Sequence, residues 1–136
     1  MKNLSRQVAK FGGGLKITLT GTVEQVDAGV NQLFNYGIIS NVPEDYREGR
    51  DESVTCSSYR PRFLRGLKCL AECQMKEIAI PQPDSFLGLV YRSDRKLWRK
   101  IAMIRAARLA RQMFDFSGRG WRNGAGVEGA GVQVAL

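Results

Sequence analysis

Alternating apolar and polar positions predict short strands in the first two thirds of the chain. In residues 15–23 (LKITLTGTV), every second side chain from Leu15 to Leu19 is apolar, and Lys or Thr stands between them. A period of two is typical of a strand with one buried face. Residues 54–59 (VTCSSY) and 75–80 (MKEIAI) predict two further short strands, the second of which ends at the prolines of PQP.

Apolar side chains at helical spacing predict helices between these strands. In residues 24–37 they recur every three or four positions, and Gly37 stands where a helix would end. Residues 61–73 have the same spacing and begin with a proline, which is favoured in the first turn. Residues 84–91 (DSFLGLVY) fit either a strand or a helix.

The longest helix is predicted for residues 94–114 (DRKLWRKIAMIRAARLARQMF), with the aspartate or the serine before it as N-cap. Leu97, Ile101 and Ile104 form an apolar stripe when residues are placed at about 100° intervals. Arg108 falls in the same stripe, so basic groups surround this helix instead of occupying one face.

The remaining segments define the domain organisation. We expect residues 1–14 to form an N-terminal arm or a short helix that ends at GGG, and residues 118–136 to form a flexible Gly-rich tail. Residues 15–117 are predicted to form one globular α+β domain with three or four short antiparallel strands and two or three helices, including the long basic C-terminal helix. If residues 75–80 and 84–91 are both helical, an all-α fold results.

Charge is distributed unevenly along the 136 residues, whose formal net charge is +8. The first 53 residues hold six basic and seven acidic side chains, whereas the rest hold fifteen basic and six acidic ones. Such a concentration predicts attraction to nucleic acid or to an anionic membrane surface. The carboxylates of residues 44–52 lack calcium-loop spacing. We expect a solvated loop there; shielding of the basic face and contact with a basic partner are alternatives.

Three groups of residues are candidates for contact with nucleic acid. The long helix has no acidic side chain from residue 95 to 112, so its cations repel one another unless a polyanion neutralises them. Arginine suits bidentate phosphate contacts. Aromatic side chains beside cations stack on unpaired bases; Tyr59 fits this, whereas we expect Phe63 in the core. The three groups are Arg95, Lys96, Arg99, Lys100, Arg105, Arg108 and Arg111 on the long helix, Arg60, Arg62, Arg65 and Lys68 before it, and Arg119, Trp121 and Arg122 in the tail.

Catalysis and metal binding have little support in the sequence, and no cofactor is predicted. The chain contains no histidine, which excludes Ser–His and Cys–His catalytic pairs and histidine metal sites. Three cysteines cannot all pair internally, and no signal peptide or membrane-spanning segment is evident. We therefore expect an intracellular protein of a reducing compartment, with free thiols.

The leading hypothesis is a non-enzymatic RNA-binding protein of low sequence specificity, which holds phosphates and gains from being a homo-oligomer or part of a larger assembly. One alternative is a viral structural protein of matrix or capsid type that self-assembles and contacts anionic membrane or nucleoprotein. The order of strand 15–23 and helix 25–37 resembles the start of matrix proteins from negative-strand RNA viruses, which implies self-association and membrane attachment. That likeness is confined to these residues and no PPxY motif is present, so we do not assign the family. Another alternative is a ribonucleoprotein subunit, for instance of a ribosome.

Overall fold

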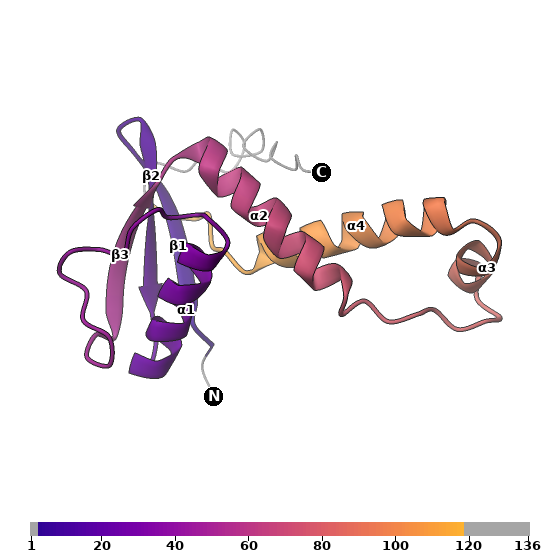
Figure 1. Cartoon of the computed structure of the whole chain (residues 1–136), viewed down its shortest axis with the longest axis horizontal. Coiled ribbons are helices and arrows are strands. Elements are labelled where there is room, and N and C mark those ends of the chain that lie inside the picture. The colour runs from indigo at the N-terminus through magenta and orange to yellow at the C-terminus, as the bar shows by residue number, and fades with distance from the viewer. Residues whose placement is uncertain (1–2, 119–136) are drawn as a thin grey trace.

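Seven elements follow one another in residues 3–118, the part of the chain that the computed structural model describes. The three strands form one antiparallel sheet in the order β1–β2–β3. Helices cover one face of it (Figure 1). The α+β prediction is confirmed, with four helices instead of two or three, and most of the predicted tail lies outside the described residues. The elements are β1 (Ser5–Phe11), β2 (Gly14–Thr20), α1 (Val23–Asn35), β3 (Ser53–Ser58), α2 (Arg60–Met75), α3 (Phe86–Ser93) and α4 (Arg95–Gln112).

Strand β1 lies where the sequence predicted an arm or a short helix, and that prediction is wrong. It pairs with β2 over its whole length, across a turn in which Gly12 has a φ of 61°, a conformation that favours glycine. Within β1 only Val8 is buried, so no period of two was visible in the sequence. Pairing with β2 and with a segment far along the chain stabilises the strand: the Val8 N–H donates to the Asp115 carbonyl, and the Asp115 N–H to that of Arg6, each at 2.7 Å.

The main core lies between the sheet and the helices. The predicted alternation of β2 is confirmed, because its apolar side chains are buried, whereas on the other face the Thr18 hydroxyl lies 3.3 Å from that of Thr55. Helix α1 begins with a capping box at Thr22. Gly29, inside this helix, is explained by close packing, since a Cβ there would lie 2.7 Å from a methyl carbon of Leu4.

Residues 76–85 form a turn and loop, so the strand predicted for residues 75–80 is wrong. The apolar positions of that segment do not share a buried face: Ile80 is 66% exposed and Ile78 half-buried. The ambiguous segment after it forms helix α3, whose N-cap hydroxyl at Ser85 accepts the Gly88 N–H at 2.9 Å.

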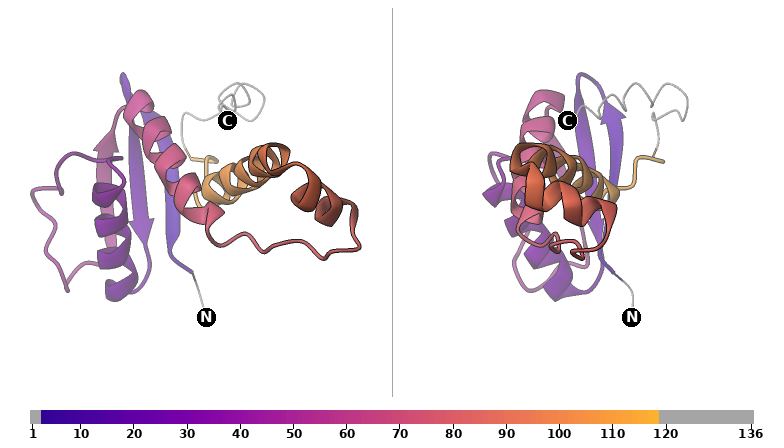
Figure 2. Two further views of the ribbon diagram at one scale, coloured as in Figure 1. Left: turned by 45° about the vertical axis from the view of Figure 1, so that its right-hand side comes forward. Right: turned by 90° about the vertical axis from the view of Figure 1, so that its right-hand side faces the viewer.

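Helix α3 and the first half of α4 project from the sheet as an arm, which we define as residues 76–102 (Figures 1 and 2). The arm has a small core of its own in Val90, Trp98 and Ala102. The second half of α4 packs in the main core with α2. The chain then returns to the sheet, and the ring of Phe114 meets that of Phe63 at 5.1 Å.

Candidate nucleic-acid interface

The buried face of α4 is not the apolar stripe that the sequence predicted. Trp98 and the alanines at positions 102, 106 and 110 are buried, at a spacing of four residues. Leu97 and Ile104 are 43% and 47% exposed. Small side chains allow α4 to approach α2 closely, and this outweighs the greater hydrophobicity of the isoleucines. Hydropathy alone therefore pointed to the wrong side of the helix.

The cations of α4 divide into two groups on different sides. Four exposed residues in its first turn and a half, at about 100° per residue, fall within an arc of about 140°. Arg105 and Arg108, also exposed, point to nearly the opposite side. One rigid polyanion can therefore lie along one group but not along both. The four residues are called the quartet below: Arg95, Lys96, Arg99 and Lys100.

Two arginines of α4 are held by aromatic rings. The Arg95 Nε–H donates to the Tyr91 carbonyl at 2.7 Å, and its guanidinium lies 3.9 Å from the centre of the Tyr91 ring. Arg95 remains exposed and is pre-positioned. Arg111 is half-buried 4.4 Å from the Phe116 ring, and burial lowers the pKa of its guanidinium. Arg111 therefore belongs to the packing at the base of α4, and we leave it out of the interface.

Cations stand at the positive ends of two helices. α2 begins with Arg60 and Arg62, has no acidic residue in its first turn and has no side-chain cap. α4 begins with Arg95 and Lys96, and its first turn likewise lacks an acidic residue beyond the cap Asp94. An anion at such a helix end stabilises it by about 0.3–1 kcal/mol. α2 forgoes this gain entirely, whereas in α4 the Asp94 carboxylate, which accepts the Leu97 N–H at 3.1 Å, supplies part of it. The uncapped start of α2 therefore favours an anion supplied from outside.

The acidic loop, residues 41–52, lies at the end of the molecule opposite the arm (Figure 1). Its shape depends on Asp27, whose carboxylate accepts the Tyr46 hydroxyl at 2.6 Å and the Gly49 N–H at 2.9 Å. Burial, and then this hydrogen bond, raise the pKa of Tyr46. Within residues 3–118, no ion pair joins a carboxylate to the quartet. The acidic loop therefore does not neutralise the quartet in its own molecule.

The second predicted group lies on α2. Arg60, Arg65 and Lys68 are exposed, whereas Arg62 is half-buried, with one guanidinium nitrogen 3.5 Å from the Gly37 carbonyl oxygen. Phe63 is in the core, as predicted. The third predicted group, Arg119, Trp121 and Arg122, lies outside the described residues.

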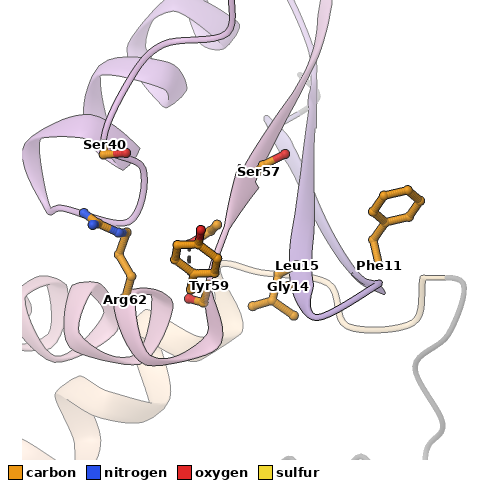
Figure 3. Close-up of a pocket in the computed structure, with 8 residues that line it drawn as sticks. Phe11, Gly14, Leu15, Ser40, Ser57, Tyr59 and Arg62 are labelled. Atoms are coloured by element: carbon orange, nitrogen blue, oxygen red, sulfur yellow. Dashed lines mark hydrogen bonds between the residues drawn. The ribbon is translucent and has the colours of Figure 1, made fainter.

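A pocket of about 260 Å³ opens where the sheet meets the start of α2 (Figure 3). Tyr59 and Arg62, which the sequence analysis named as candidates for contact with bases and phosphates, are two of its lining residues. Sequence reasoning missed Ser40 and Ser57, because only the fold brings together the loop after α1, the end of β3 and the β1–β2 hairpin. The lining residues are Phe11, Gly14, Leu15, Ser40, Ser57, Ser58, Tyr59 and Arg62.

Other chemistry is sparse in the described part of the chain. All three cysteines are free; Cys69 and Cys73 are exposed, and burial raises the pKa of Cys56 to about 11. Residues 3–118 contain no cluster of three side chains suited to hold a metal ion. None of their helices has the length and apolar character needed to cross a membrane. No protein-family model, curated protein or solved structure matches the chain.

Proposed function

We propose that this protein is a non-enzymatic RNA-binding protein that holds the phosphate backbone through the quartet on α4. One observation carries the proposal: four exposed cations share one side of a projecting helix and have no carboxylate partner among the described residues. Like charges at this spacing repel, and phosphates relieve the repulsion while releasing counterions. Because phosphate contacts carry no sequence information, specificity is low.

An exposed tyrosine next to the cations of α2 favours single-stranded RNA over duplex DNA as the ligand. Tyr59 is 65% exposed and stands directly before Arg60 at the start of α2. Exposed rings beside arginines suit unpaired bases, which a duplex keeps stacked. The quartet covers only about 8 Å of helix axis, so several copies on one strand would strengthen binding by multivalency.

The test compares two pairs of substitutions on the same helix. Arg99→Gln/Lys100→Gln removes two quartet charges, and Arg105→Gln/Arg108→Gln removes two charges from the opposite side. Binding to a single-stranded RNA is measured by fluorescence anisotropy across a range of salt concentrations, with circular dichroism to verify folding. The quartet pair is expected to make the log–log salt slope shallower by about 1.4, at about 0.7 per phosphate on a single strand. The control pair should change the slope much less.

Three results would overturn the proposal: a flat salt slope for the wild-type chain, equal effects of the two pairs, or binding to phosphatidylserine vesicles without binding to RNA. The last result would support the alternative of a membrane-attached structural protein.

A further inference from the structure

The quartet provides phosphate contacts, and the pocket at the start of α2 has the features needed to hold a base. We infer that this pocket binds one unpaired nucleotide of the RNA, with the base stacked on Tyr59 and a neighbouring phosphate on Arg62. The inference rests on the proposed function and adds a site that distinguishes single-stranded from double-stranded RNA.

Tyr59 provides the stacking surface. Its ring is 65% exposed, and as the N-cap residue of α2 it makes no side-chain capping hydrogen bond. Gly14 stands behind it: a Cβ at Gly14 would lie 3.9 Å from the ring and 2.8 Å from the Ser58 carbonyl oxygen. The close approach of the Ser58 carbonyl therefore requires glycine at this position, and the Tyr59 ring lies within van der Waals distance of the hairpin. Base–aromatic stacking of this kind tolerates any base.

Polar groups around the pocket are available for a ligand. Ser58 is committed to the fold, because its buried hydroxyl donates to the Ile38 carbonyl at 2.6 Å. The hydroxyls of Ser40 and Ser57 make no hydrogen bond to any residue in the described range. A hydroxyl both donates and accepts, so it suits the mixed edge of a base. The 3.5 Å contact of Arg62 is long, which leaves its guanidinium donors free for a phosphate.

Size and position also fit one nucleotide of a longer strand. The pocket, at about 260 Å³, is smaller than the roughly 300–1,000 Å³ of sites for drug-sized ligands. α2 leads from it to the arm: Arg62 in its first turn lines the pocket, and Met75 at its end packs against the arm core. The 16 residues of α2 span about 24 Å, and Arg65 and Lys68 are exposed between the ends. A strand following α2 would therefore meet cations from Arg62 to Lys68, before it reaches the exposed Glu72 one turn nearer the arm.

The test uses Tyr59→Ala, Tyr59→Phe and a matched control, Phe86→Ala, which removes an exposed ring from the arm. The probe is a single-stranded RNA labelled with 2-aminopurine, whose fluorescence falls on stacking. Tyr59→Ala should weaken binding about 10-fold and abolish the quenching, with an unchanged salt slope, because no charge is lost. Tyr59→Phe should stay within about twofold, since the ring is kept. Phe86→Ala should behave as the wild type.

The outcomes separate the two proposals. If Tyr59→Ala and Phe86→Ala bind RNA equally well, or if the wild type does not quench 2-aminopurine, the pocket inference is overturned. The proposed function would then still be supported by the slope change of the quartet variant. If the wild type binds no RNA, the pocket inference and the proposed function are both overturned. If AMP binding depends on Tyr59 but RNA affinity does not, the pocket takes a free nucleotide, and its assignment to RNA is wrong.

Discussion

Lys96→Glu should make the protein more stable while it weakens RNA binding. Lys96 is exposed, forms no hydrogen bond or ion pair within residues 3–118, and is the second residue of α4 after the cap Asp94. A carboxylate at this position stabilises the folded protein by about 0.5 kcal/mol, because it lies near the positive end of the helix dipole. It also stands four residues before Lys100, the favourable order for an ion pair of about 0.3–0.5 kcal/mol.

The two contributions together raise the free energy of unfolding by about 1 kcal/mol. For a domain of this size, that raises the melting temperature by about 4 °C. The gain should shrink in 1 M salt, which screens surface charges beyond about 3 Å. RNA affinity should fall, with a salt slope shallower by at least about 0.7, because one phosphate contact is lost and repulsion replaces it.

Differential scanning calorimetry and RNA titrations on the same samples measure both effects. Lys96→Gln is the control, because it removes the cation without creating the ion pair and should stabilise less. A destabilised Lys96→Glu protein would show that Lys96 supports the fold, and unchanged RNA affinity would show that the quartet is not the binding surface. Either result would refute the reasoning.

Two further predictions concern the main core. Gly66→Ala should destabilise the protein by about 1–3 kcal/mol, because the new methyl carbon would lie 2.2 Å from Cγ1 of Ile38; a urea midpoint at or above that of the wild type would contradict this. Iodoacetamide at pH 8 should label the two exposed cysteines of the native protein and spare Cys56, whose pKa of about 11 leaves about one thiol in a thousand ionised. Mass spectrometry should then count two additions in the native state and three in denaturant, and rapid native labelling of Cys56 would show that the core opens.

Local sequence patterns predicted the strand and the helix whose own apolar residues form a buried face. The alternation of β2 and the spacing and terminal glycine of α1 correspond to real buried faces and to a real helix end, where Gly37 has a φ of 76°. β1 could not be predicted in this way, because Val8 alone is buried in it and its other stabilising interactions come from β2 and from Asp115.

The candidate site was predictable as a set of residue types, but not as a geometry. Charge counting found the cations of α4, whereas their division into two sides follows from which face packs on α2. That face contains Ala106 and Ala110, which carry almost no hydropathy signal beside the isoleucines. The pocket depends on the β2–β3 register, which places Leu15 opposite Ser58, and no local window of sequence contains that information.

The parallel bridge between Gln7 and Asp115 has a consequence for how the protein is made. The outer edge of the first strand stays open until a segment more than a hundred residues later has left the ribosome. During synthesis, that edge is a surface on which a second nascent chain, or a chaperone, can add a strand. Closure of the sheet by its own chain is thus a late event in synthesis.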